Sequence, residues 1–175
     1  MKVYALFNDE SALFARIAGL REQVAEARKS RPKGDALLRR LEDFDGKLDA
    51  IRKKIVATKE SGAITGEERL REHTDQLYGA VTSWDGPPSA YQLENIAALR
   101  AQLGEIDGDF TRVISNQLPE LNNALKSKGA QALTVPPLAV FSGGEPGSGG
   151  VAVSGQYDPD AARGVQVPTN LKLWN

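Results

Sequence analysis

The sequence contains no cysteine, a single histidine and no surplus of charge of either sign. Without cysteine the chain has no disulfide framework, no thiol nucleophile and no cysteine-ligated metal. Lys and Arg together number 22 and Asp and Glu number 23, and the first 135 residues hold 20 of each. Nucleic acid is therefore not expected as a partner, because neutralising phosphates needs a clustered surplus of basic side chains.

Long apolar runs are missing as well. The N-terminal stretch MKVYALFNDESALF reaches polar and acidic residues within eight positions, so it lacks the apolar segment of a signal peptide. No later stretch approaches the eighteen or so apolar residues of a membrane-spanning helix. We therefore expect a soluble chain with no membrane partner and no export signal of its own. In a longer parent protein such a signal could lie elsewhere, so the sequence leaves the compartment open.

Apolar residues repeat at helical spacing in the first sixty residues, which predicts two helices, at 9–31 and 35–61. The first repeat consists of Leu13, Ile17, Leu20, Val24 and Ala27, with Val3, Phe7 and Phe14 as a sign of an earlier start. The second, a heptad seam, consists of Leu37, Leu41, Phe44, Leu48, Ile51 and Ile55. Pro32 and Gly34 separate the two helices, and Asp35 can cap the second.

The stretch KESGAITGEERLREHTDQLYGAV, residues 59–81, raises the question of a phosphate loop because two glycines lie four residues apart. A Walker loop needs a lysine and a hydroxyl after its second glycine. Here Gly66 precedes Glu67 and Glu68, which would repel an anion. Gly62 suits a helix C-terminus, and Thr65 with Glu68 matches a capping box. The stretch is interpreted as a turn that opens a third helix at 66–84, with Leu70, Leu77, Val81 and Trp84 as its buried stripe.

A second capping box, at Ser89 and Gln92, predicts a fourth helix at 89–128. Pro119 should bend that helix or start a new segment. Its predicted apolar stripe is Leu93, Ile96, Leu99, Leu103, Ile106, Phe110, Val113, Leu118, Leu121 and Leu125.

Together these patterns predict an all-α fold, an antiparallel up-and-down four-helix bundle over residues 1–135. Residues 136–175 are expected to form a Gly/Pro-rich, mostly extended tail with short strands at most. Within that tail, residues 142–156 are expected to be flexible because of their glycine content.

His73 is the first candidate for chemistry. A dyad with Glu72 or Asp75 would still need a nucleophile, and zinc or di-iron sites need several more ligands. Glu67 and Glu68 could act as paired carboxylates, but acidic residues at a helix start also stabilise the helix dipole. We therefore assign no catalytic, cofactor-binding or metal-binding residue.

Three segments carry a resemblance to a known family: residues 59–81, WDGPPSAYQLENIAALRAQL and LPELNNALKSKG. They resemble the C-terminal helical region of bacterial sialidase-like β-propeller proteins with BNR/VPS10-type repeats, often labelled glycosyl hydrolases. The resemblance covers about residues 11–135. It implies that any hydrolase chemistry belongs to a propeller, and no Ser-x-Asp-x-Gly-x-Thr-Trp repeat of such a propeller occurs here.

The sequence therefore predicts a non-catalytic helical accessory module that needs no cofactor. The resemblance implies that it packs on an upstream propeller, and self-association is the other way it could act. The alternative is an independent small enzyme or ligand-binding bundle that uses carboxylates in an interhelical cleft. As an interaction surface we single out Trp84, Asp85 and Tyr91, because aromatic side chains beside rigid turns make good anchors. Trp84 could instead close the end of the core.

Overall fold

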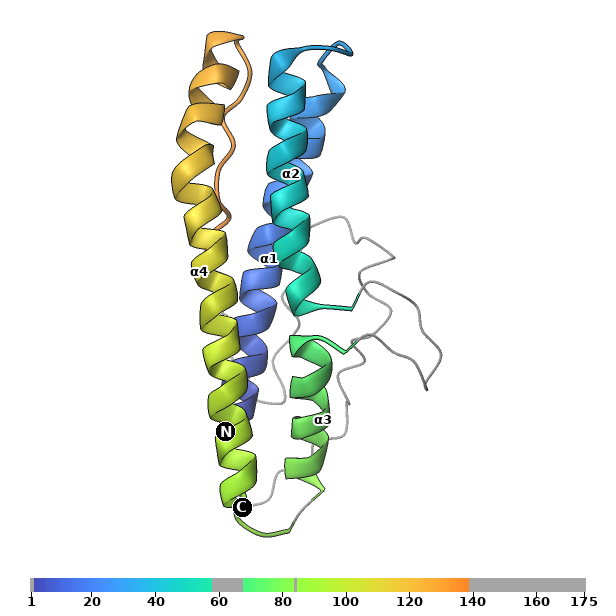
Figure 1. Cartoon of the computed structure of the whole chain (residues 1–175), viewed down its shortest axis with the longest axis vertical. Helices are drawn as coiled ribbons and strands as arrows, with labels where there is room; N and C mark the ends of the chain where they lie inside the picture. The colour runs from blue at the N-terminus through green and yellow to red at the C-terminus, as the bar shows by residue number, and fades with distance from the viewer. Residues whose placement is uncertain (1, 58–67, 84, 139–175) are drawn as a thin grey trace, which may run out of the picture. The chain divides into compact units, whose positions relative to one another are not determined.

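The computed structural model describes residues 2–57, 68–83 and 85–138, and every regular element in them is an α-helix. The helices are α1 (Lys2–Lys29), α2 (Ala36–Ile55), α3 (Leu70–Thr82) and α4 (Ala90–Ser127) (Figure 1). The predicted all-α fold with four helices is thereby confirmed. No helix in the described ranges is both long and apolar enough to cross a membrane. The predicted tail beyond residue 138, with its 142–156 segment, lies outside the described residues.

The second and third helices run in the same direction, one after the other, and both are antiparallel to α1 and α4 (Figure 1). The N-terminal half of α1 packs on α3, where Arg71 donates to Ser11, and its C-terminal half packs on α2, where Arg28 pairs with Glu42. Each level of the bundle therefore holds three helices side by side. The connection at 56–69 exceeds the roughly two to five residues of a helical hairpin, so α3 need not turn back along α2.

The predicted apolar seams form the core. All six seam residues of α2 are buried, and the seam of α1 extends back to Val3 and Leu6. In α4 the stripe is buried or partly buried except for Leu93, which is 44% exposed. Leu93, Ile96 and Leu99 follow one another at intervals of three residues, and each interval rotates the helix about 60° less than a full turn. Leu93 therefore lies off the buried stripe.

Three predicted helix boundaries are wrong. The first helix begins at Lys2 rather than at residue 9, and α2 ends at Ile55 rather than 61, because Val56 is extended (φ −126°, ψ 141°). The third helix begins at Leu70 rather than 66, since the two residues before it are not helical.

The start of α3 at Leu70 is fixed by Glu72. The Glu72 carboxylate accepts from the backbone N–H of Arg69 at 2.8 Å and from that of Ala57 at 3.3 Å. It thus ties the chain after α2 to the first turn of α3. Thr65 itself, like Gly62 and Gly66, lies outside the described residues.

The fourth helix begins as predicted. The Ser89 hydroxyl accepts from Gln92 N–H at 3.2 Å, and the Gln92 side chain accepts from Ser89 N–H at 2.9 Å. The new segment expected at Pro119 does not appear, because α4 continues through it to Ser127. The ring of Pro119 faces solvent, and packing of Phe110 and Leu121 on either side outweighs the roughly 3 kcal/mol cost of a helical proline.

After α4 the chain returns in extended form along the groove between α1 and α4; we call residues 130–138 the strap (Figure 1). Leu133 of the strap is buried, and the Asn122 amide of α4 bonds both its N–H (2.8 Å) and its C=O (2.9 Å). The Gln23 amide of α1 does the same for Thr134, with both bonds 2.8 Å long. Side-chain amides on two helices therefore replace the neighbouring strands that this extended backbone lacks.

Further along the strap, Pro136 packs on α1. Its carbonyl accepts from Arg16 Nε at 3.3 Å, and a Cβ added at Gly19 would lie only 3.0 Å from its ring. Glycine at this position of α1 therefore makes room for the proline.

We expect Asn122→Ala to lower the free energy of unfolding by about 1–3 kcal/mol, because it leaves the partly buried N–H and C=O of Leu133 without partners. Denaturant unfolding measures this loss. Asn123→Ala is the matched control, since Asn123 is exposed on the same turn and should change stability by no more than about 0.5 kcal/mol. Equal losses in the two variants would show that the strap contact contributes nothing.

Candidate functional site

Two polar residues occupy apolar seam positions, one on α1 and one on α3. Glu10 continues the α1 seam between Leu6 and Leu13, and Thr74 lies in the α3 stripe between Leu70 and Leu77. Both are completely buried, and the Glu10 Oε1 atom lies 2.6 Å from the Thr74 hydroxyl oxygen. The other carboxyl oxygen of Glu10 is buried and has no hydrogen-bond partner among the described residues.

Burial is the main influence on the charge of Glu10, and it raises the pKa of the carboxyl to about 7. The hydrogen bond with Thr74 and the charge of Arg71 lower this pKa, whereas Asp75 and Glu72 raise it. A protonated Glu10 also fits the geometry. It donates to the Thr74 hydroxyl, which in turn donates to the Leu70 carbonyl at 3.0 Å.

Arg71 lies beside this pair without forming an ion pair with Glu10. Its guanidinium lies over the rings of Phe7 and Phe14, at 5.3 and 5.6 Å from their centroids, and donates to the Ser11 hydroxyl at 2.8 Å. Aromatic faces attract such a cation. Among the described residues, Arg71 is thus the cation that acts on the buried carboxyl, and its guanidinium has these other contacts while its Nε is buried without a hydrogen-bond partner.

The sequence contains a signal for this site, although it is not a motif. Extending the α1 seam backward from Leu13 in steps of three and four places Glu10 in the core register, between apolar residues on both sides. An ionisable residue at such a position is rarely buried unless it is paired.

His73, the first sequence candidate, is brought close to Glu68, with 3.8 Å between Nδ1 and Oε2. It is not paired with Glu72, which holds the start of α3, or with Asp75, which lies near Arg71 and Glu10. Glu67 lies outside the described residues. In the part of the chain that the structure describes, no three potential metal ligands gather.

A cavity of about 200 Å³ adjoins His73 where α2, α3 and α4 meet. It is lined by Lys54, Glu68, Arg69, His73, Gln102, Glu105, Ile106 and Asp109. Lys54 and Asp109 pair with each other at 2.7 Å across it. Its described lining includes no hydroxyl or thiol, so the cavity brings no such nucleophile to His73.

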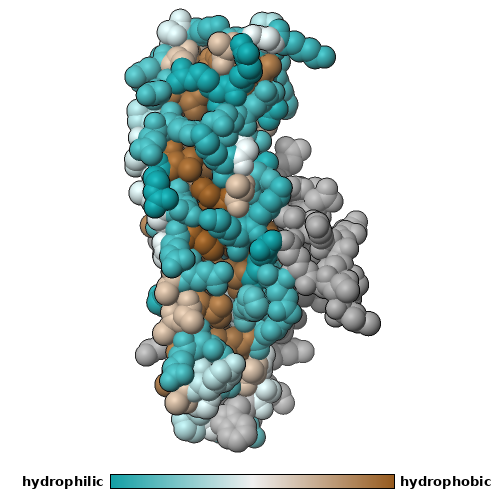
Figure 2. All heavy atoms as spheres, in the orientation of Figure 1, coloured by the Kyte–Doolittle hydropathy of each residue, from teal (hydrophilic) through white to brown (hydrophobic). Residues whose placement is uncertain are grey.

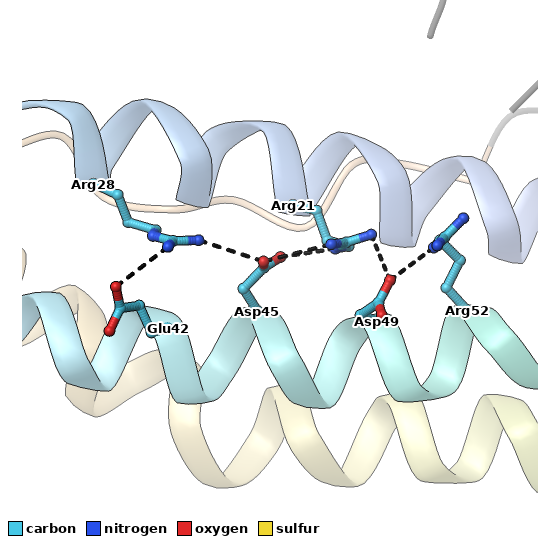
Figure 3. Close-up of polar contacts among 6 residues, drawn as sticks. All are labelled: Arg21, Arg28, Glu42, Asp45, Asp49 and Arg52. Carbon is cyan, nitrogen blue, oxygen red and sulfur yellow. Dashed lines mark hydrogen bonds and ion pairs between the residues drawn. The ribbon is translucent and has the colours of Figure 1, made fainter. Parts of the chain in front are cut away.

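The densest group of charges joins α1 to α2 (Figure 3). It consists of Arg21 and Arg28 of α1 and Glu42, Asp45, Asp49 and Arg52 of α2. Arg21 lies between two carboxylates, 2.7 Å from Asp45 and 2.8 Å from Asp49. Burial would raise the pKa of Asp49, but hydrogen bonds from Lys53 and Arg52 and the charge of Arg21 lower it below its usual value. Each charge has an opposite neighbour, so the group fixes how α1 and α2 align.

The predicted interaction surface lies where α4 begins. Asp85 is exposed, Tyr91 is 71% exposed, and Trp84 lies outside the described residues. Two further apolar side chains are exposed at the same end of the bundle, Leu93 of α4 and Tyr4 of α1. The first residues of α1 and of α4 lie at the same end of the bundle because the two helices are parallel. The ion pair of Asp9 with Arg100, 3.3 Å long, joins their N-terminal parts.

No protein-family model, no curated protein and no solved structure matches this chain. The resemblance to the helical region of sialidase-like propeller proteins gains no support from these comparisons and stays a prediction.

Proposed function

We propose that the chain is a non-catalytic helical interaction module that binds a partner through the end of the bundle where α1 and α4 begin. One observation carries this proposal. Among the described residues, four large hydrophobic side chains are exposed, and Tyr4, Tyr91 and Leu93 lie at this one end, whereas Leu138 lies in the strap. Gathered exposed apolar side chains are typical of binding surfaces, whereas scattered ones need no explanation.

The surface of α4 supports the proposal. Its outward side carries Ala97, Ala101, Gly104 and Gly108, all exposed, at spacings of four, three and four. Side chains this short let another helix approach closely. Figure 2 shows apolar side chains reaching the surface in a narrow seam along the bundle, flanked by hydrophilic ones. The partner is a second copy of the chain or, as the resemblance implies, a β-propeller.

An enzyme or ligand-binding bundle is the second candidate, and the cavity beside His73 and Glu68 is the observation that favours it. It ranks below the interaction module because three charged side chains of that cavity already have polar partners. Lys54 pairs with Asp109, and Glu68 accepts from Gln76 at 3.1 Å.

Sedimentation of the full chain over a concentration series, alone and with a separately expressed propeller of the resembled family, tests the proposal. We expect association in at least one arm, weakened by the double variant Tyr91→Ala, Leu93→Ala. Leu138→Ala is the control, since Leu138 is an exposed apolar side chain in the strap. No association in either arm would overturn the proposal. Turnover of chromogenic glycosides that is lost in His73→Ala would favour the second candidate.

A further inference from the structure

Helix α3 is attached to the bundle through a small apolar cluster of its own. Val3 of α1, Leu77 and Val81 of α3 and Ile96 of α4 form this cluster, and the partly buried Leu99 of α4 packs against both it and the main core. Leu70 is the one buried apolar residue of α3 that belongs to the main core. The rest of the bundle could therefore keep its core if α3 left. With only 13 residues, an isolated α3 would hardly be helical in water, so its helix depends on docking.

The buried polar contact between Glu10 and Thr74 lies within this attachment, and its hydrogen bonds depend on one proton. The Thr74 hydroxyl lies within donating distance of both Glu10 Oε1 (2.6 Å) and the Leu70 carbonyl (3.0 Å), but it has only one proton. With a proton on Glu10, the carboxyl can donate to Thr74, and the hydroxyl proton is then available to the Leu70 carbonyl. With Glu10 ionised, the single hydroxyl proton of Thr74 must turn to the carboxylate. The second carboxylate oxygen then carries charge in a buried place without any partner, which is costly.

The charged groups around Glu10 compensate for only part of that cost, through the charge of Arg71. From α3, Arg71 is held by Ser11 and the two phenylalanine rings, while Glu72 and Asp75 disfavour a further negative charge. From α4, Arg100 reaches α1 but pairs there with Asp9. The charges of α2 that face α1 pair with Arg21 and Arg28, further along α1.

We propose that the Glu10–Thr74 contact is a proton-dependent attachment of α3: while Glu10 is protonated α3 stays docked on α1, and ionisation of Glu10 favours its release. Release exposes the apolar side chains of the small cluster and leaves the α1–α2–α4 core in place. This inference does not depend on the partner-binding surface proposed above.

The direction of the effect follows from the two protonation states. Glu10 has a pKa of about 7 when α3 is docked and returns toward 4.5 when water reaches it. The docked state therefore binds the proton more tightly, and docking weakens as the pH rises from about 4.5 to 7. Between pH 5.5 and 8.5 the docking equilibrium should fall by about 30-fold.

Hydrogen exchange of the full chain at pH 5.5 and 8.5, expressed as protection factors that correct for the intrinsic rate, tests the proposal. We expect the α3 amides to lose protection by about 30-fold while the α2 amides lose much less. Glu10→Gln, or Glu10→Leu as a second neutral variant, should abolish the loss in α3. Asp75→Asn is the control. Asp75 is an exposed residue near the same contact, and loss of some of its hydration raises the pKa of its carboxyl as well.

Four results would overturn the proposal. Protection of α3 could be independent of pH in the unmodified chain. The loss could persist in both neutral variants at position 10, or vanish in Asp75→Asn alone, which would assign it to Asp75. Equal losses in α3 and α2 would mean that the whole bundle opens, so that α3 has no separate release.

Discussion

Replacing Glu10 by Gln should raise the free energy of unfolding by about 3 kcal/mol at pH 8 and change it by less than about 0.5 kcal/mol at pH 4. The reason is the raised pKa of about 7 for this carboxyl in the folded chain, against an ordinary value of 4.5. Below pH 4.5 the Glu10 carboxyl is protonated in both the folded and the unfolded chain, so it does not lower the free energy of unfolding. As the pH rises toward 7 the unfolded chain loses its proton first, and stability is lost.

Denaturant unfolding of both proteins at a series of pH values measures this difference. Asp9→Asn is the matched control: Asp9 is the neighbouring acid on α1, is 55% exposed on its side chain and pairs with Arg100 at the surface. Its removal should change stability by about 0.5 kcal/mol or less at any pH. If Glu10→Gln is no more stabilising at pH 8 than at pH 4, the carboxyl is not held neutral by the fold.

Asp49 gives the opposite pH dependence, because the folded chain lowers its pKa below 3.8. Its stabilising contribution is present above pH 3.8 and is lost as the pH falls through the lowered value. Glu10 and Asp49 together therefore place the greatest stability between about pH 4 and 5, to the acid side of the usual range.

Phe44→Ala should lower the free energy of unfolding by about 3–5 kcal/mol, since it removes one of the two largest fully buried side chains of the described core and leaves a cavity. Phe44 lies in the middle of the α2 seam, where the surrounding helices cannot easily collapse into the space. Thermal or denaturant unfolding measures the loss.

Arg39→Ala is the control for that substitution. Arg39 is exposed on the same helix, and no hydrogen bond or ion pair of its side chain is found among the described residues. It should cost about 0.5 kcal/mol or less. A loss below about 1 kcal/mol for Phe44→Ala would mean that α2 does not pack in the observed register.

The seams of α1 and α2 could be predicted because a continuous apolar repeat needs only local spacing to place it on a helix face. The same repeat, extended to residue 10, would have shown that Glu10 enters the core. Its partner Thr74 lies 64 positions away, and no local pattern pairs the two. The paired hydrogen bonds between side-chain amides and the strap could not be predicted either, since Gln23 and Thr134 are 111 positions apart.

The start of α3 was mispredicted for a related reason. Thr65 and Glu68 have the spacing of a capping box, but Glu72 also accepts from Ala57 after the preceding helix. This tertiary contact and the hydrogen bond from Arg69 set the helix start at Leu70. The spacing of residues in the sequence does not predict such a tertiary contact. The direction of α3 also depends on which faces of α1 and α4 remain for it to cover.

We expect the buried contact of Glu10 and Thr74 between α1 and α3 to keep the Glu10 carboxyl neutral. The most direct test is a pH titration of the Glu10 carboxyl carbon by ¹³C NMR in glutamate-labelled chain, with Glu10→Gln to assign the signal. A buried neutral Glu10 requires a midpoint near 7. A midpoint near the ordinary value of 4.5 would show a solvated carboxyl and contradict the claim.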